Sequence, residues 1–288
     1  MKYLLVKHRG SHQHMEPEQE MQNSGDRSVK AVANYWDTHT LGKQYVDDRS
    51  IEVGTHEYFE HVRRWMSPFK FPWIMERIES EAQNLEGKHL LELGCGMGFA
   101  SLEFLNRGVK VTATDLTPNA VELTRRHFLI EGVKAESVQI ENALNLSFED
   151  ETFDAVWANG VLHHTGDTRA AIQDIWRVLK PGGRAIISHF YRRPSWMYFV
   201  SRVGRENIEF KEEDPPVTDF YTEKEILSMF DGFKIEKTAA EHYRALPIAR
   251  RGLKAALYRY AFRPVYNLIP EALARRLAYK FSVTAVKL

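Results

Sequence analysis

The sequence predicts an α/β fold built on a mostly parallel sheet, and three observations support this prediction. Between about residues 87 and 190, short apolar runs with strand character alternate with amphipathic helical stretches, a pattern typical of βαβ units. Glycine and proline residues separate these runs. The 288 residues are 43% hydrophobic and 27% charged, which suits one good-sized domain with extra segments.

Five strands and three helices are expected in this central segment. The strand-like runs are 88–93, 109–114, 137–140, 153–159 and 183–190, and the helical runs are 98–108, 117–132 and 167–179. The second helix has clear ends, because Thr117 is a typical N-cap, Pro118 suits the first helical position and Gly132 follows the last turn. Ligands of such sheets bind at the carboxyl ends of the strands, so we expect the functional site there.

The N-terminal part divides into a leader and a helical cap. Residues 1–27 have no hydrophobic period, and we expect them to be disordered. We interpret the leader's His8, His12 and His14 as solvated side chains, and no metal site is expected. Residues 28–86 form the predicted cap, with a helical stripe of Val29, Val32, Tyr35 and Trp36 and further helices at 56–69 and 72–85.

The C-terminal part departs from the alternation. Residues 191–221 are aromatic, charged and proline-bearing, and we interpret them as a lid over the substrate. Residues 222–288 are expected to complete the sheet around a basic helical insert, 244–280. Within this part, the pattern predicts helices at 222–232, 248–262 and 270–280 and strands at 233–243 and 281–288.

Charge is distributed unevenly along the chain. From Arg244 onward there are ten Lys or Arg residues and one acid, Glu271, although the whole chain has net charge zero. The basic helices either lie on an anionic membrane surface or cap the fold with their cations toward solvent, and we favour the cap. The neutral total disfavours a general nucleic-acid binder.

Composition also sets an expectation for the compartment. A single cysteine excludes a disulfide framework, and no apolar run approaches the roughly 20 residues that span a bilayer. We therefore expect a soluble cytoplasmic protein. The sequence does not indicate the oligomeric state.

A glycine-rich turn follows the first strand of the central segment. In "LLELGCGMG", Glu92 precedes Gly94, Gly96 and Gly98, and this spacing brings bare backbone close to a ligand. An acid at this place would repel a pyrophosphate but suits a ligand with sulfonium and ammonium charges, such as S-adenosylmethionine. Asp115 ends the next strand, where a carboxylate can accept ribose hydroxyls.

Four segments resemble, in order and spacing, the motifs of class I S-adenosylmethionine-dependent methyltransferases of the ubiquinone-biosynthesis type. They are "LLELGCGMG", "VTATDLTPNAVELTRR", "IENALNLSFEDETFDAVWANGVLHHTGD" and "IWRVLKPGGRAIIS". The resemblance covers about residues 85–190. It implies a Rossmann-like, seven-stranded sheet of order 3-2-1-4-5-7-6 with the last strand antiparallel, S-adenosylmethionine as cofactor and S-adenosylhomocysteine as product.

The resemblance also assigns cofactor contacts to positions of this chain. The methionine half would lie on the glycine turn, the ribose on Asp115 and the adenine beside Leu116. Asn142 stands where relatives carry an Asp that binds the adenine amino group, and an amide oxygen can accept the same hydrogen bond. The full set is Glu92, Gly94, Cys95, Gly96, Gly98, Asp115, Leu116, Asn142, Ala143, Asn159 and Gly160.

The candidates for acid–base chemistry are His163 and His164 in "GVLHHTGD", in the loop after the fourth strand. Imidazole is suited to take a proton from a hydroxyl or ammonium nucleophile. His164 aligns with a histidine of relatives and is preferred. Further aromatic residues are candidates to face the substrate, although most are expected in the core: Tyr35, Trp36, Tyr58, Trp65, Tyr191, Trp196 and Tyr198.

The predicted function is methyl transfer from S-adenosylmethionine to an oxygen, nitrogen or sulfur atom of a small organic molecule. A nicotinamide-dependent oxidoreductase and a non-catalytic subunit of the same fold stay open as alternatives, as does a lipid or isoprenoid substrate at a membrane surface. "DPPV" (214–217) imitates the motif of nucleic-acid base methyltransferases but lies beyond the fifth strand, so no nucleic-acid substrate is expected.

Overall fold

The computed structural model describes most of the chain. The described residues are 29–39, 50–66, 72–196, 198–199, 215–241, 243–244 and 253–288. The predicted leader, 1–27, and a large part of the predicted lid lie outside them. Within these ranges no helix is long and apolar enough to cross a membrane, and no three His, Cys, Asp or Glu side chains are grouped to hold a metal.

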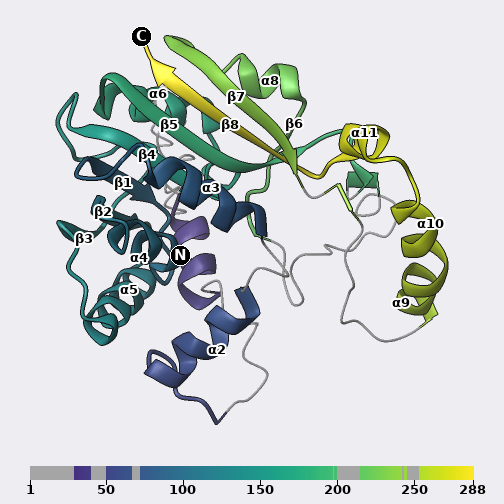
Figure 1. The fold of residues 1–288 in the computed structure, drawn as a ribbon, viewed down its shortest axis with the longest axis horizontal. Helices are drawn as coiled ribbons and strands as arrows, with labels where there is room; N and C mark the ends of the chain where they lie inside the picture. The colour runs from purple at the N-terminus through teal and green to yellow at the C-terminus, as the bar shows by residue number, and fades with distance from the viewer. Residues whose placement is uncertain are drawn as a thin grey trace, which may run out of the picture.

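The described strands form one twisted mixed sheet, and Figure 1 shows them side by side. Its order is β3-β2-β1-β4-β5-β8-β7, and β6 pairs with β5 outside this path. β8 runs antiparallel to both of its neighbours, and the other pairs are parallel. The strands are β1 (His89–Leu93), β2 (Lys110–Asp115), β3 (Ser137–Ile140), β4 (Phe153–Asn159), β5 (Leu179–Arg192), β6 (Phe220–Tyr221), β7 (Phe233–Glu241) and β8 (Lys280–Lys287).

Seven of these strands follow the order expected from the resemblance, with the last strand of the chain antiparallel. The two-residue β6 is an addition that the sequence did not predict. It pairs in parallel with the end of β5, through Tyr191 and Phe220. The fold is the Rossmann-like α/β fold that was predicted.

Helices cover both faces of the sheet. The helices are 29–38, α2 (His56–Met66), α3 (Pro72–Ala82), α4 (Phe99–Leu105), α5 (Pro118–Glu131), α6 (Thr168–Val178), α8 (Glu223–Leu227), α9 (Leu253–Leu257), α10 (Arg263–Asn267) and α11 (Glu271–Ala274). α3, α4 and α5 contribute to the core on one face, and α6 and α8 to the core on the other. Thr117 caps α5 and Gly132 ends it, as predicted.

Alternation along the central strands divides the core between these two faces. Leu91 and Val156 belong to the cluster under α6, whereas Leu90 and Trp157 belong to the cluster under α3 and α4. Successive side chains of a strand point to opposite faces, and both faces are apolar because both are covered. This double burial explains the continuous apolar character of the short runs in the sequence.

Several predicted element ends were wrong. β5 begins at Leu179, ahead of the predicted 183, and α8 ends at Leu227, short of the predicted 232. The helix predicted at 270–280 stops early: α11 is followed by a 3₁₀ turn, Arg275–Leu277, and Lys280 already lies in β8 opposite Tyr191 and Glu241. Sheet pairing overrides the helical pattern there. The predicted helix 248–262 is described only from Leu253, and it contains a π-helical turn, Tyr258–Phe262.

Candidate active site

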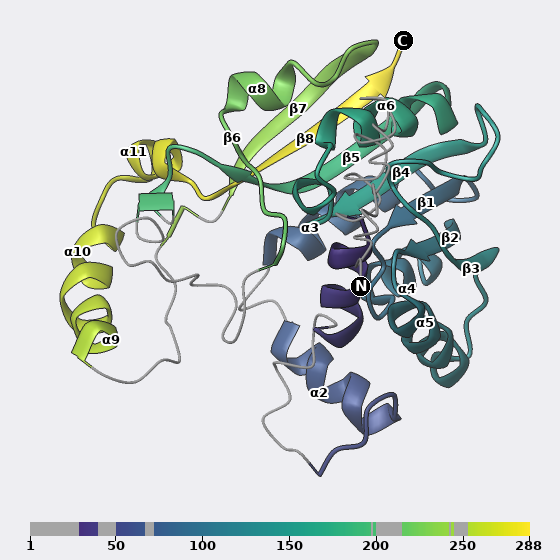
Figure 2. The same cartoon turned by 180° about the vertical axis from the view of Figure 1, so that it is seen from behind.

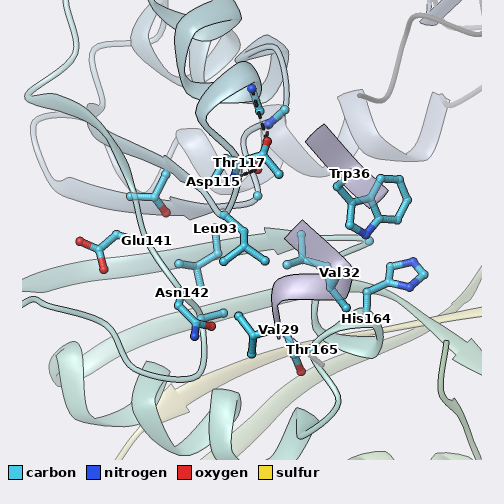
Figure 3. A pocket seen from close by; sticks show the side chains of 18 of the residues that line it. Val29, Val32, Trp36, Leu93, Asp115, Thr117, Glu141, Asn142, His164 and Thr165 are labelled. Atoms are coloured by element: carbon cyan, nitrogen blue, oxygen red, sulfur yellow. Dashed lines mark hydrogen bonds between the residues drawn. The ribbon is translucent and has the colours of Figure 1, made fainter. Parts of the chain in front are cut away.

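A pocket opens at the carboxyl ends of β1, β2 and β4 (Figure 3). The sequence predicted the functional site at these strand ends. Helix 29–38 covers it from the other side. Nine of the predicted cofactor or catalytic residues line it: Gly94, Gly96, Asp115, Leu116, Asn142, Ala143, Asn159, Gly160 and His164. Glu92, Cys95, Gly98 and His163 do not.

The three glycines of the turn have three different surroundings. A Cβ at Gly94 would lie 2.3 Å from Val161 Cγ2, and one at Gly98 would lie 2.8 Å from side chains of α5. At Gly96, φ is +58° and no atom lies within 4 Å of the Cβ position. Packing therefore requires glycine at both ends of the turn, and the middle glycine opens toward the pocket.

Asp115 is hydrogen-bonded to the glycine turn and to the start of α5. Its Oδ2 accepts the Gly96 N–H at 3.0 Å, and its Oδ1 accepts the N–H and the hydroxyl of Thr117, both at 3.0 Å. Burial raises the pKa of the Asp115 carboxyl, and these hydrogen bonds oppose the rise. Asp115 also lines the pocket, where a carboxylate oxygen can accept a hydrogen bond from a ligand hydroxyl.

Glu92 lies behind the turn, and it does not line the pocket as a charged contact for the ligand would. Its side chain is buried and accepts a hydrogen bond from the Ser101 hydroxyl. Burial raises the pKa of Glu92 to about 8, so at neutral pH the carboxyl is mostly protonated. The Glu92 side chain points toward Ser101 of α4, so a direct contact with a cationic ligand stays a prediction.

Cys95 is buried between the turn and α5. Its Sγ lies 3.4 Å from the Thr124 hydroxyl, and burial raises the pKa of the thiol well above its usual range. A buried thiol of this kind is a poor nucleophile.

Two amides line the pocket. Asn142 Oδ1 accepts the N–H of Leu144 at 3.0 Å, so one of its two lone pairs is used within the chain. Asn159 Oδ1 is buried and has no hydrogen-bond partner among the described residues. An unsatisfied buried acceptor is costly unless a ligand donates to it. The ammonium group of an amino-acid ligand is such a donor.

The charged groups of the lining favour a positively charged ligand over one that carries phosphates. Among the described residues, two acids, Asp115 and Glu141, line the pocket, and no lysine or arginine does. Phosphate groups are bound by cations or by a helix N-terminus, and carboxylates repel them. The acceptor-rich lining fits S-adenosylmethionine, which carries an ammonium, a sulfonium and two ribose hydroxyls but no phosphate.

The adjacent histidines are placed differently. His164 lines the pocket, and its Nδ1 lies 2.7 Å from the carbonyl oxygen of Val217. Its ring packs edge-on against Trp36 at 5.1 Å. His163 lies behind it, 1% exposed, with its ring between those of His164 and Tyr191. Burial lowers the pKa of His163 well below its usual range, so this ring is neutral.

Comparison with known proteins agrees with this geometry. Residues 91–187 match the family described as methyltransferase domain. Over 143 residues, or 50% of this chain, the sequence is 34% identical to the ubiquinone biosynthesis O-methyltransferase of Pseudomonas fluorescens, and the match spans 59% of that protein's length. Residues 91–187 form a class I methyltransferase domain.

Solved structures share the fold of this methyltransferase domain. A SAM-dependent methyltransferase from Methanosarcina mazei superposes with a TM-score of 0.50 at 22% identity, over 72% of this chain and 96% of that chain. The [4+2]-cyclase SpnF superposes with a TM-score of 0.55 at 17% identity, over 89% of this chain and 94% of that chain. These likenesses concern the fold, which hosts more than one chemistry.

The cover of the methyltransferase domain contributes residues that sequence reasoning did not assign to the cofactor site. Val29, Val32 and Trp36 of helix 29–38 line the pocket. Their spacing had indicated an apolar helix face, but not what that face covers. The other unassigned lining residues are Leu93, Thr114, Thr117, Ala120, Glu141, Val161 and Thr165.

Trp36 is the one aromatic candidate found in the lining of this pocket, within the described ranges. Tyr35 stacks on His39, and Tyr58 is buried against Phe59. Other candidates pack against aromatic neighbours at the β5 end of the sheet: Tyr191, Trp196 and Tyr198. The side chain of Trp65 lies outside the described residues.

Proposed function

We propose that this protein transfers a methyl group from S-adenosylmethionine to an oxygen or nitrogen atom of a small organic molecule, with sulfur as a further acceptor. One observation carries the proposal: the pocket of the methyltransferase domain presents Asp115, Glu141 and the unsatisfied Asn159 Oδ1, and no lysine or arginine among its described lining. A nicotinamide dinucleotide would bring its phosphates onto this lining.

The residues of the site divide the work of holding the cofactor. Asp115 is placed to accept a ribose hydroxyl, Asn159 to accept from the ammonium group and Leu116 to pack beside the adenine. When bound, S-adenosylmethionine supplies the methyl group on an electrophilic sulfonium. The protein then contributes alignment and exclusion of water, and Val29, Val32 and Trp36 provide the apolar cover.

His164 is the group placed to remove a proton from the acceptor. A carbonyl oxygen only accepts hydrogen bonds, so the contact of 2.7 Å to Val217 makes Nδ1 the donor. In the neutral ring Nε2 is then the acceptor nitrogen, which suits a base. In the view of Figure 3, His164 and Trp36 lie together at one end of the pocket and Glu141 at the other. The acceptor therefore approaches beside His164, and the adenine lies toward Glu141.

The relative in Pseudomonas fluorescens is named for O-methylation in ubiquinone biosynthesis, and this supports an oxygen acceptor. A lipid or isoprenoid acceptor is the second candidate, and the basic C-terminal helices favour it. The pocket argues against a non-catalytic role, because Asp115 and the glycine turn, which are expected to bind the cofactor, are both present.

The experiment has two stages. Titration calorimetry with S-adenosylhomocysteine and with NADH tests the cofactor, and we expect binding of the first and none of the second. Methyl-labelled donor is then incubated with phenols, catechols, amines and thiols, and label transfer identifies the acceptor. Binding of NADH without any response to S-adenosylhomocysteine would overturn the proposal.

A further inference from the structure

One helical segment projects beside the sheet and has two apolar faces. Residues 253–267 run through α9, the π-helical turn and α10 without a break, and Figures 1 and 2 both show them set apart from the sheet. The inner face carries Tyr258, Phe262 and Tyr266, four residues apart. These rings pack on Trp196 at 6.3, 6.2 and 5.6 Å. This contact attaches the segment to the end of β5.

The outer face is also apolar, and it is exposed. Leu253, Leu257, Tyr260 and Leu268 recur at helical spacing, and Leu253 and Leu268 are 79% and 82% exposed. Across the described residues, fourteen large apolar side chains are exposed, and six of them, leaving out Phe262 of the inner face, fall within residues 253–273. Such a concentration marks an interaction surface, whereas scattered exposed residues do not.

The same segment is positively charged. Residues 253–277 contain five Lys or Arg residues and one acid, Glu271. That acid is paired within the segment, with Arg275 at 2.7 Å. By helical spacing, Arg259 and Arg263 fall on the flank between the two apolar faces. A helix with apolar side chains outward and cations along its flank suits the interface of an anionic bilayer.

We propose that residues 253–277, the basic arm, dock this protein on a membrane surface rich in anionic lipid. The exposed leucines and Tyr260 would enter the boundary between headgroups and acyl chains, and the arginines would lie at the phosphate level. A second copy is a poorer occupant, because a two-fold contact would bring two net-positive arms together. The arm docks from outside and does not span the bilayer.

Vesicle co-sedimentation with the full chain tests this proposal. We expect binding to vesicles of phosphatidylcholine with about 30 mol% phosphatidylglycerol, weak binding to phosphatidylcholine alone, and loss of binding at about 1 M salt. Leu268→Asp should weaken binding to the anionic vesicles about tenfold or more. Leu129→Asp is the matched control, since Leu129 on α5 is also 82% exposed and should leave binding unchanged.

Several outcomes would overturn the proposal: no binding to anionic vesicles, equal losses for the two variants, or light scattering that shows Leu268 at a dimer contact without vesicle binding. Affinity for S-adenosylhomocysteine is measured for each variant and should not change. A failure of membrane docking is thereby distinguished from a failure of the proposed methyl transfer.

Discussion

At the scale of single residues, the hydrogen-bond acceptors that line the pocket differ in how many internal hydrogen bonds they already accept. Asp115 lines the pocket and accepts three internal hydrogen bonds, and Asn159 Oδ1 has no described partner. Glu92 is buried behind them, and burial raises the pKa of its carboxyl to about 8. The site therefore selects a ligand that brings donors and positive charge, and the selection comes from groups that stay unsatisfied without it.

Asp115→Ala should weaken the affinity for S-adenosylhomocysteine by about 1.5–3 kcal/mol, or about 10- to 150-fold in Kd, because ribose hydroxyls are then poorly paired. Titration calorimetry measures this loss. Asp231→Ala, at an exposed position, is the control and should bind normally. An unchanged Kd for Asp115→Ala would remove this residue from the site.

Glu92→Gln should change how stability depends on pH. A carboxyl whose pKa is raised in the folded state, here to about 8, stabilises the fold most at low pH, and this contribution is lost as pH rises toward 8. The lowered pKa values of His127 and His163 change the free energy of unfolding only below pH about 6.5. Between pH about 6.5 and 8, the free energy of unfolding of the unmodified protein should therefore fall by up to about 1.4 kcal/mol per pH unit.

Urea unfolding at several pH values measures this slope. In Glu92→Gln the decline should be much smaller, because the amide does not titrate. Glu122→Gln, at an exposed position, should keep the decline. Parallel curves for Glu92→Gln and the unmodified protein would contradict the assignment.

His164→Ala should lower turnover about 10²–10⁴-fold if the acceptor arrives protonated, the usual contribution of a positioned base. Affinity for S-adenosylhomocysteine should change little, since the acceptor side of the pocket is affected. Single-turnover assays with labelled donor and calorimetry separate the two effects. Turnover close to that of the unmodified protein would exclude His164 as the base.

At the scale of elements, two hydrogen bonds join helix 29–38, which covers the pocket, to the start of α5. Asp37 Oδ1 accepts the N–H of Asn119 at 3.1 Å, and the Asn119 amide donates to the carbonyl of Asp37 at 3.0 Å. The first turn of α5 has N–H groups without helical partners, and Asp37 satisfies one of them. The cover of the pocket and the helix after Asp115 therefore depend on each other.

Asp37→Ala should raise the Kd for S-adenosylhomocysteine about three- to tenfold, because about 1 kcal/mol of hydrogen bonding holds the cover closed. Stopped-flow fluorescence should place the change mainly in the dissociation rate. Asp37→Asn retains an acceptor and should restore most of the affinity. An unaltered dissociation rate in Asp37→Ala would show that helix 29–38 does not retain the ligand.

At the scale of the whole molecule, a buried ion pair connects the helical cap to the far strands of the sheet. Arg77 of α3 lies 2.8 Å from Glu241 of β7 and donates to the Ser188 hydroxyl of β5 at 2.6 Å. Burial opposes ionisation of Glu241, but His189 and Arg77 hold its pKa below the usual range. The cap is therefore fastened to β5 and β7, which lie beyond the strands whose ends form the pocket.

Arg77→Met should destabilise the protein by about 3 kcal/mol or more, because Glu241 is left as a buried charge. The double variant Arg77→Met with Glu241→Leu should recover much of this loss. Arg169→Met breaks the exposed pair with Asp231 and should cost less than about 1 kcal/mol. Urea unfolding compares the three variants, and equal costs for Arg77→Met and Arg169→Met would refute the role of the buried pair.

The sequence by itself determined the sheet, most of its elements and the glycine turn with Asp115, because strand alternation, helix caps and glycine spacing are local properties of the chain. Only the tertiary structure decided which side chains share the pocket. It separated His163 from His164, buried Glu92, and turned Val29 and Val32 toward the ligand site. Periodicity reveals that a face is apolar but not what covers it, since that depends on elements distant in the chain. The outward face of the basic arm has the same kind of pattern and remains uncovered.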